Sequence, residues 1–428
     1  MKNLRIIAVA VLLVCFLVFL PSCQRRPSVD RYGRINLYWA MWDYRLTVYY
    51  TAIIEAYQEK NPGVRIVPVD LGSADFSTVL MTQLAGGANL DILTIKDIPG
   101  YANLIRQNRL LPLNSFIEEE NIDIELYGGI VEQLMVDGEV FALPFRSDFW
   151  LVFFNKDIFD AAGVPYPTND MTLDEFEALA RLVTSGSGAS RIFGAHYHTW
   201  RSTVQLFGIL DGMHTMVDGN YDFLRPHYER VLRKQDDGIV MPYALLRTSG
   251  IHYSGVFFNG QVAMMNMGTW FIGMQMERVA LGQAERSRNW GMVKYPRPEG
   301  VPAGTTLGTI TGIGVNRNSR HREEALDFVR FVSGLEGALI LAQTGTIPAL
   351  LNDEVIDKIA SMPGFPPDVN SREALNVYRT FLEMPLHERS AEIEIILNEA
   401  HDAIMTRNIS VENGIRQMNE RVGRILAR

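Results

Sequence analysis

Short apolar strands alternate with amphipathic helices near the start of this sequence, and this pattern restricts the fold more than any other feature. Asn61-Pro62-Gly63 ends the first helix and separates it from the next strand. Such alternation predicts an α/β fold, in which helices cover both faces of a parallel-rich sheet. We expect strands over 34–39, 64–69 and 91–95, and helices over 46–60, 76–84 and 98–107.

Two of the predicted strands end in polar and aromatic residues. In parallel sheets, ligands bind beyond the C-terminal ends of the strands. We expect a loop over 40–43 after the first strand, and Trp42, Asp43 and Asp97 are therefore candidate ligand-binding residues. The simpler interpretation of each carboxylate is a helix cap or a surface ion pair. For the tryptophan it is burial in the core.

A second informative segment runs from Gly138 to Gly163. Apolar residues at 140–145 and 149–154 flank the polar trio Arg146-Ser147-Asp148. The pattern predicts two strands separated by a polar bend, followed by a short helix that Gly163 ends. Arg146 can donate hydrogen bonds to a ligand in a fork, and the Asp148 carboxylate can accept hydrogen bonds from ligand hydroxyls. The alternative is a buried strand pair with a solvated bend.

The N-terminus predicts export from the cytoplasm. Lys2 and Arg5 precede an almost wholly apolar segment over 6–20, and Cys23 follows directly after the expected cleavage position. This order is typical of a secretory signal, here a lipoprotein signal over 1–22 with the lipid on Cys23 and a linker over 23–33. Pro21 departs from the residue usual before such a cut. An uncleaved anchor helix is the alternative, and either one tethers an extracytoplasmic body to the membrane.

Length and composition exclude several classes of protein. A chain of 428 residues is longer than one hydrophobic core usually supports, so two domains or lobes are expected. The net charge of −9 argues against nucleic acid as a partner. Cys15 and Cys23 are the only cysteines, which leaves the mature body without a disulfide, a thiolate metal site or a cysteine nucleophile. His196-x-His198 has no third ligand at a recognisable spacing, and we expect no metal site.

Several segments in the right order resemble the extracellular solute-binding proteins of ABC importers, in particular the sugar-binding branch (family 1, similar to maltose-binding protein). Leu90 departs from this resemblance, because a proline is usual there. The matching segments are Ala56–Ile66, Leu80–Ile92, Leu110–Asn114, Gly138–Gly163, Phe257–Trp270 and Leu307–Asn316.

The resemblance implies a two-lobed fold of the periplasmic-binding-protein type (type II), with three crossovers of the chain at a hinge. The N-lobe would comprise 34–145 and 312–360, and the C-lobe 146–311 and 361–428, with the third crossover near Pro363 to Pro367. It implies a monomeric, non-catalytic receptor that closes on a sugar or oligosaccharide and delivers it to a permease pair driven by an ATPase. No cofactor is implied.

Aromatic residues and threonines complete the expected binding site. Tryptophan offers a flat apolar face to the C–H side of a sugar, whereas carboxylates, amides and guanidinium groups bind its hydroxyls. Trp200 and Trp270 are the candidates for stacking, and the resemblance favours Trp270. Thr309 and Thr311 stand between glycines at the expected second crossover and are candidate hydroxyl donors. Their alternative role is hinge geometry alone.

Three other functions remain open from the sequence. An extracytoplasmic carbohydrate enzyme would need a carboxylate pair, whose spacing the sequence does not give. A binding protein of the same fold could take an anion, an iron complex or a peptide, although anion sites favour helix N-termini and basic residues over tryptophans. A receptor that feeds a sensor instead of a transporter would have the same sequence features.

Overall fold

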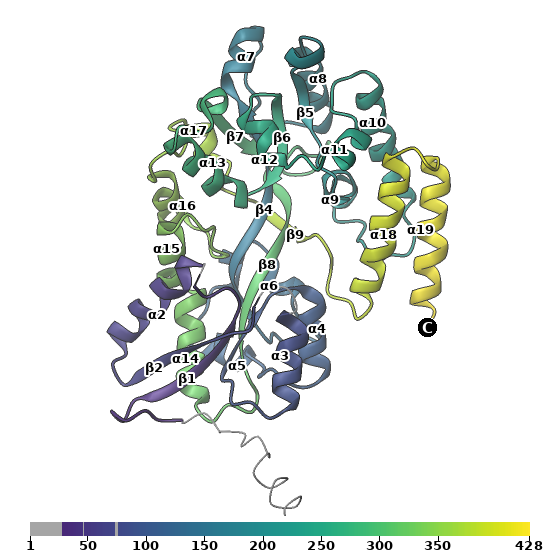
Figure 1. The fold of residues 1–428 in the computed structure, drawn as a ribbon. Helices are drawn as coiled ribbons and strands as arrows, with labels where there is room; N and C mark the ends of the chain where they lie inside the picture. Colours follow the sequence, from purple (N-terminus) through teal and green to yellow (C-terminus); the bar gives the residue numbers. More distant parts are fainter. Residues whose placement is uncertain (1–27, 46, 73–75) are drawn as a thin grey trace, which may run out of the picture.

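Two lobes joined by long strands make up the protein in its computed structural model, which describes residues 28–45, 47–72 and 76–428 (Figure 1). The predicted signal over 1–22 and Cys23 lie outside the described residues, as does the start of the linker. Within the described ranges, no helix is both long and apolar enough to cross a bilayer. The mixed α/β fold, with helices flanking a curled sheet, confirms the predicted class.

The N-lobe is built on β1 (Ile35–Met41), which pairs in parallel with β2 (Val64–Asp70) and β3 (Ile92–Ile95). Alternate residues of β1 enter different cores. Leu37, Trp39 and Met41 belong to the core cluster that contains α2 (Val48–Lys60) and α14 (Arg322–Ser333) residues, whereas Tyr38 and Ala40 pack with residues of α3 (Phe76–Ala85) and α4 (Ile98–Arg106). Helices therefore cover both faces, as the alternation predicts.

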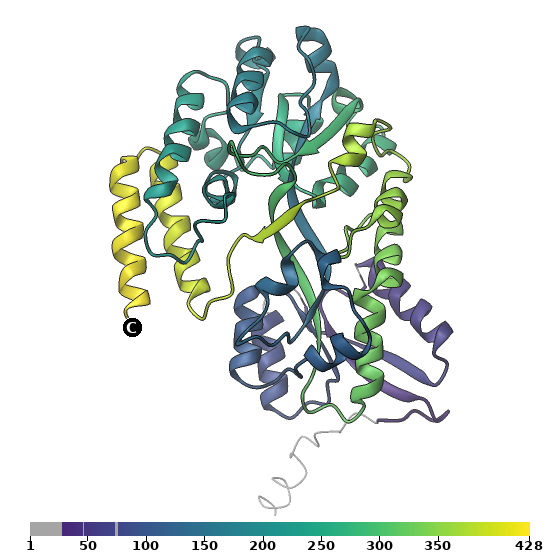
Figure 2. The ribbon, with the colours of Figure 1, turned by 180° about the vertical axis from the view of Figure 1, so that it is seen from behind.

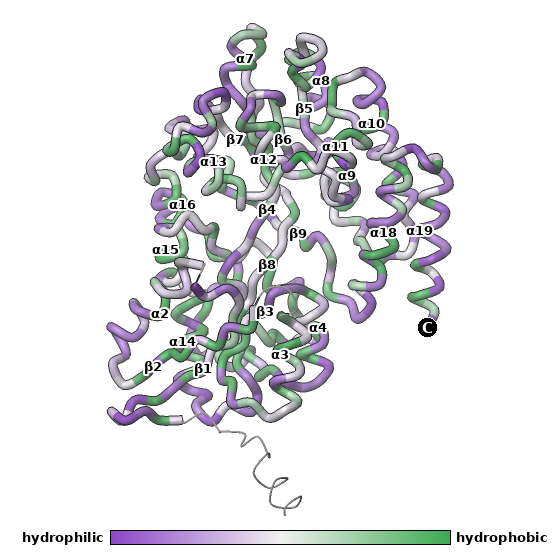
Figure 3. Tube along the Cα trace, in the orientation of Figure 1, coloured by the Kyte–Doolittle hydropathy of each residue, from purple (hydrophilic) through white to green (hydrophobic). Residues whose placement is uncertain are grey.

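The first strand is longer than the sequence pattern suggests. Ala40 and Met41 were expected in a loop, but they pair with Val69 and Asp70 and are fully buried. Trp39 is also fully buried, and its indole nitrogen donates to Thr94 Oγ1 at 2.8 Å. Strand pairing and burial therefore continue to the residue before Trp42. Figure 3 shows the hydrophobic residues concentrated along these N-lobe strands.

The expectation of two strands around the polar trio is wrong. A single strand, β4 (Leu143–Asn155), runs through it and pairs antiparallel with β8 (Thr305–Val315). Arg146 lies opposite Thr311 and Asp148 opposite Thr309, with one irregularity between Pro144 and Arg146. Polar side chains do not interrupt this strand, because its backbone groups remain hydrogen-bonded to β8. The two strands carry the chain between the lobes (Figures 1 and 2).

The C-lobe sheet continues from β4. Strands β6 (Val262–Gly268) and β7 (Trp290–Lys294) pair antiparallel with β4, and β5 (Phe193–His196) pairs in parallel with β6. The hydrogen-bonded order is β2-β1-β3-β8-β4-β6-β5, and the sheet is mixed because β4 and β8 run in opposite directions between the lobes. Apart from three helices that follow α14, the other α-helices of the described residues are α5 (Asn114–Glu119), α6 (Ile130–Gln133), α7 (Lys156–Ala162), α8 (Leu173–Val183), α9 (Ser202–Gln205), α10 (Arg225–Asp236), α11 (Tyr243–Ser249), α12 (Tyr253–Phe258), α13 (Trp270–Ala280), α18 (Ser390–Met405) and α19 (Val411–Leu426).

The predicted helix end at Gly163 is confirmed. Gly163 ends α7 in the left-handed region, with φ 64°. Thr172 and Glu175 form a complete capping box at the start of α8. Phe328 and Val329, on the inner face of α14, are fully buried.

After α14 the chain passes along one edge of both lobes. Helix α15 (Leu335–Gln343) contacts α2 and β4, and α16 (Asp353–Ala360) leads to α17 (Val369–Glu373), which contacts β7. The chain then returns to the crossing strands as β9 (Arg379–Leu382), which pairs in parallel with residues 305–308 of β8. Figure 2 shows β9 beside the crossing.

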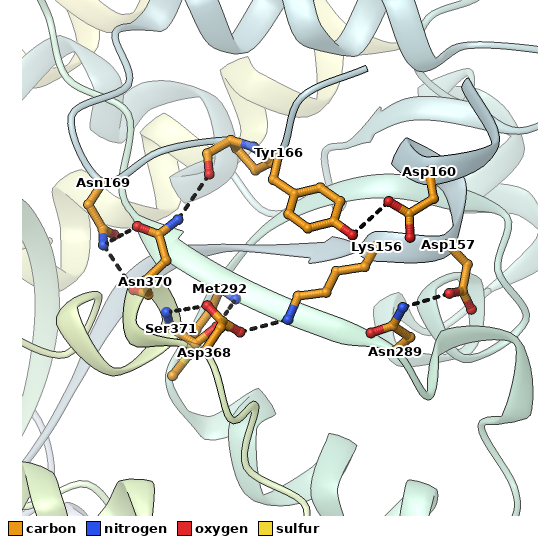
Figure 4. A network of polar contacts seen from close by, with 11 residues as sticks. Lys156, Asp157, Asp160, Tyr166, Asn169, Asn289, Met292, Asp368, Asn370 and Ser371 are labelled. Atoms are coloured by element: carbon orange, nitrogen blue, oxygen red, sulfur yellow. Dashed lines mark hydrogen bonds and ion pairs between the residues drawn. The ribbon is translucent and has the colours of Figure 1, made fainter. Parts of the chain in front are cut away.

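A polar network fixes α17 to the C-lobe (Figure 4). Lys156 Nζ lies 2.6 Å from Asp368 Oδ2, and Asp368 also caps α17 by accepting from the Ser371 amide at 2.8 Å. The Met292 amide of β7 donates to Ser371 Oγ at 3.1 Å. Burial raises the pKa of Asp368, but the hydrogen bonds from Lys156 and Ser371 outweigh it and hold this pKa below its ordinary value.

Replacing Lys156 with methionine should destabilise the protein. Asp368 would keep its charge without a cationic partner, and hydrogen bonds to charged groups contribute about 1.5–3 kcal/mol. We expect the free energy of unfolding in urea to fall by about that amount. Lys358→Met replaces an exposed lysine of α16 and should change it little. Equal effects of both substitutions would show that the Lys156–Asp368 contact does not stabilise the fold.

Histidines within the C-lobe should make stability depend on pH. Burial lowers the pKa of His196 and His401 to about 3, and the pKa of His198 and His227 to about 4. In the unfolded chain each should bind a proton near pH 6.5. The unfolded state therefore gains protons first as the pH falls, and the stability from neutral burial is lost below about pH 6.5.

Chemical unfolding at two pH values measures this loss. Between about pH 7 and pH 5 each histidine should remove roughly 2 kcal/mol from the free energy of unfolding. His401→Gln should reduce this pH dependence. A free energy of unfolding that stays constant over the interval would contradict the account.

Candidate functional site

Four polar side chains share one face of the crossing strands. Residues directly opposite each other in an antiparallel pair point to the same side of the sheet. Arg146 and Asp148 of β4 therefore face the same way as Thr311 and Thr309 of β8. Thr309 is exposed there. The structure brings together these four residues, which the sequence placed at two separate crossovers.

Two donors hold the Asp148 carboxylate. Arg146 Nη2 donates to Asp148 Oδ2 at 2.7 Å, and Thr269 Oγ1 donates to Asp148 Oδ1 at 3.1 Å. The backbone fixes Thr269 in turn, because its amide donates to the Phe149 carbonyl at 2.9 Å. Asp148 is 8% exposed. The carboxylate is therefore fixed at the junction of β4 with the start of α13.

Arg146 keeps its charge and has a free donor. Burial lowers its pKa, but Asp148 and Tyr49 raise it more, so the net shift is above the ordinary value. Tyr49 of α2 lines the same hollow as Arg146 and raises its pKa from the N-lobe side. Arg146 Nε is buried and has no hydrogen-bond partner in the part of the chain that the structure describes. Such an unsatisfied donor is costly unless a ligand accepts from it.

An aromatic wall stands beside this polar group. The Trp270 ring centroid lies 5.7 Å from that of Trp150 and 6.1 Å from that of Trp200, in edge-to-face contacts. Trp200 also contacts Tyr253 at 5.4 Å and is 37% exposed. Trp150 is buried, and its indole nitrogen donates to Glu383 Oε1 at 2.5 Å. Trp200 and Trp270 are therefore partly exposed, while Tyr253 and Trp150 pack against them.

Gly268 determines where the Trp270 ring lies. A Cβ atom at position 268 would stand 2.1 Å from Trp270 Cζ3, which is far inside van der Waals contact. Only glycine lets the indole fold back over the end of β6. Trp270 is the first residue of α13.

A hollow of about 280 Å³ joins both lobes at this site. Its polar floor comes from the crossing and its aromatic side from the C-lobe, while α2 and the segment after α15 close the rest. The lining residues are Thr47, Tyr49, Arg146, Asp148, Thr269, Trp270, Gly345, Thr346 and Ile347.

A second hollow of about 150 Å³ includes Thr309, the register partner of Asp148. Asp97 lines it from the N-lobe, and Arg201 and Glu394 line it from the C-lobe, where they form an ion pair of 3.1 Å. Glu383 lines the same hollow, and burial raises the pKa of its carboxyl. The pair Asp148 and Thr309 thus contributes one residue to each hollow.

The other predicted residues have local roles as well. Asp97 caps α4 by accepting from the Gly100 amide at 2.6 Å, and Ser77 Oγ donates to it at 3.1 Å. The Trp42 ring packs edge-to-face against Phe76 at 5.2 Å. Asp43 follows it with φ 49°, in the turn after β1. Trp42, Asp43, Trp200 and Thr311 are not among the described residues that line the two hollows.

Sequence reasoning missed several lining residues, chiefly Tyr49, Thr269, Arg201, Glu383 and Glu394. Thr269 precedes Trp270 directly, and that position was its only signal. The others carry no recognisable motif, because distant segments bring them together. Among the described residues, no cluster of three or more histidine, cysteine, aspartate or glutamate side chains could hold a metal ion.

Comparisons with known proteins agree with this architecture. The family model for bacterial extracellular solute-binding proteins matches residues 45–338. A crystal structure of a sugar transporter from Rhizobium etli, in an open conformation, is 54% identical, with a TM-score of 0.89 over 91% of this chain and 99% of that one. The sugar-binding protein MalE from Xanthomonas citri has the same fold at 17% identity, with a TM-score of 0.77 over 92% of this chain and 97% of that one.

A curated relative adds sequence evidence. The lactose-binding protein of Rhizobium radiobacter is 24% identical over 320 residues, which cover 68% of this chain and 72% of that protein. These relatives are substrate-binding proteins and not enzymes. By the extent of the family match and the likeness to the Rhizobium etli protein, the chain belongs to the bacterial extracellular solute-binding proteins of ABC transporters, family 1.

Proposed function

We propose that the protein captures a sugar or an oligosaccharide between its lobes and delivers it to the permease of an ABC importer. The observation that carries the proposal is the aromatic wall of Trp270 and Trp200 beside the Arg146–Asp148 pair. An indole face packs on the C–H side of a sugar ring, while charged groups bind its hydroxyls. The similarity to a sugar transporter and to a lactose-binding protein supports the same ligand class.

Capture takes place by hinge closure. Both hollows combine residues of the two lobes with residues of the crossing strands. A ligand there contacts both lobes only when they approach each other, so it stabilises the closed arrangement by its differential affinity. The unsatisfied Nε of Arg146 donates to a ligand hydroxyl. Trp42, Asp43, Asp97, Thr309 and Thr311 extend the polar surface of the cleft as it closes.

The lobes that move are 34–145 with 312–360, and 146–311 with 361–428. Hinge rotation then occurs at three places, which are the polar trio of β4, the glycine-flanked threonines of β8 and the segment near Pro363 to Pro367. The network around Lys156 and Asp368 supports this boundary, because it ties the chain after the third crossover to the C-lobe.

The protein works as a monomer outside the cytoplasm, held to the membrane by a lipid on Cys23. Signal cleavage before this residue leaves the linker over 23–33 between the lipid and β1. The closed form presents both lobes at once to the permease pair, whose ATPase drives import. No cofactor takes part.

A calorimetric and thermal-shift screen against a carbohydrate panel tests the ligand class. We expect at least one glycan to raise the melting temperature, since a ligand that binds only the folded state stabilises it. Amino acids, peptides and simple anions should leave it unchanged. A rise with these compounds and with no glycan would refute the sugar assignment.

Substitutions at the aromatic wall test the site itself. Trp270→Ala removes the stacking surface and should weaken glycan binding about 10- to 100-fold, which corresponds to burial of one large side chain. Gly268→Ala should weaken it as well, because the added Cβ displaces the indole. Tyr378→Ala is the matched control, because it removes an exposed aromatic ring from a hollow on the other face of β4. Glycan affinity that survives the first two substitutions would place the site elsewhere.

A further inference from the structure

A separate hollow, of about 220 Å³, lies in the N-lobe away from the cleft. Two guanidinium groups, from Arg109 and Arg320, share it with asparagine side chains and with the glycine turn after α3. Arg109 Nε is buried and has no hydrogen-bond partner among the described residues. The lining residues are Ser28, Leu84, Gly87, Ala88, Asn89, Leu90, Arg109, Asn316, Asn318 and Arg320.

Five arginines gather on the two segments that form this hollow, and we name them the base arginines: Arg106, Arg109, Arg317, Arg320 and Arg322. Across the described part of the chain none of them forms an ion pair, and the contacts they make are to uncharged groups. Arg106 donates to Asn103 Oδ1 at 2.9 Å and Arg322 to the Arg317 carbonyl at 2.6 Å. The whole chain carries a net charge of −9, so this group of arginines without ion pairs is opposite in sign to the chain as a whole.

Hydrogen bonds fix the shape of the hollow in advance. Asn316 Nδ2 donates to the Leu90 carbonyl at 2.6 Å, and the Asn316 amide donates to the Asp91 carbonyl at 2.8 Å. Ser319 Oγ donates to the buried Asp91 carboxylate at 2.6 Å. The Asp91 carboxylate is therefore already engaged by Ser319 and by the Tyr38 amide. The arginines remain available to an anion.

The first described residue, Ser28, lies at the same hollow as Arg109 and Arg320. Ser28 lines the hollow, and its carbonyl accepts from the Asn36 amide of β1 at 2.8 Å. The connection from β8 to α14, which carries Arg317 and Arg320, lies at the end of the N-lobe farthest from the C-lobe (Figure 1). Five residues after Cys23 reach Ser28, so a lipid on Cys23 would hold this end within about 18 Å of the headgroups.

We propose that the base arginines bind the phosphate of anionic phospholipid headgroups and so hold the N-lobe base against the membrane. Paired guanidinium groups suit phosphate oxygens, and each basic residue near an anionic surface adds attraction that falls off within a Debye length. The inference goes beyond solute capture. It shares only the lipid anchor with the proposed function and does not depend on the ligand of the cleft.

Hydrogen–deuterium exchange of the full chain with lipid nanodiscs tests this. Discs of phosphatidylcholine containing phosphatidylglycerol should slow exchange over 86–91, 106–111 and 316–322, and discs of phosphatidylcholine alone should not. Arg109→Gln and Arg320→Gln should each raise the phosphatidylglycerol content needed for half-maximal protection about fivefold. Protection should vanish near 1 M salt, where the Debye length is about 3 Å.

Arg233→Gln removes an exposed arginine of α10 in the C-lobe and should leave the protection unchanged. Retention of the protein on phosphatidylcholine discs depends only on the lipid on Cys23. This measurement therefore distinguishes a missing lipid anchor from a headgroup site that does not bind. Equal exchange with both kinds of disc would overturn the proposal. Equal protection by inorganic phosphate on phosphatidylcholine discs would also overturn it, since the hollow would then be a site for the free anion.

Discussion

The antiparallel pairing of β4 with β8 is the constraint on which the rest of the structure depends. Both strands run from one lobe to the other, and their register sets Arg146 opposite Thr311 and Asp148 opposite Thr309. Their backbone hydrogen bonds keep the polar segment extended, so its side chains reach the cleft instead of forming a bend. Strands of both lobes pair with these two, so the proposed closure takes place about them.

The charged pair Arg146 and Asp148 at the crossing strands is costly to bury, and neighbouring side chains stabilise it. Desolvation opposes the charges of Arg146 and Asp148, but each charge has a partner in the same sheet or beside it. Thr269 donates to the carboxylate, and Tyr49 raises the pKa of the guanidinium group. Among the described residues, Arg146 Nε has no hydrogen-bond partner. This arrangement supports the proposed capture of a ligand with hydroxyl groups.

Much of the fold could be predicted from the sequence, because local rules govern it. The strand and helix alternation, the capping box at Thr172 and the glycine after α7 each depend on neighbours within a few residues. The continuous β4 could not be predicted, because three polar side chains in a row do not reveal that β8 satisfies their backbone. Glu383 and Arg201 escaped notice because distant segments bring them to Trp150 and Thr309. Asp97 was located correctly at a strand end, yet its carboxylate caps α4.

Closure about the crossing strands is the central claim, and small-angle X-ray scattering tests it most directly. The account predicts that a glycan shown by calorimetry to bind will reduce the radius of gyration of the protein. A non-binding glycan should leave the scattering profile unchanged. Identical profiles with and without the bound glycan would contradict the claim that the lobes close on their ligand.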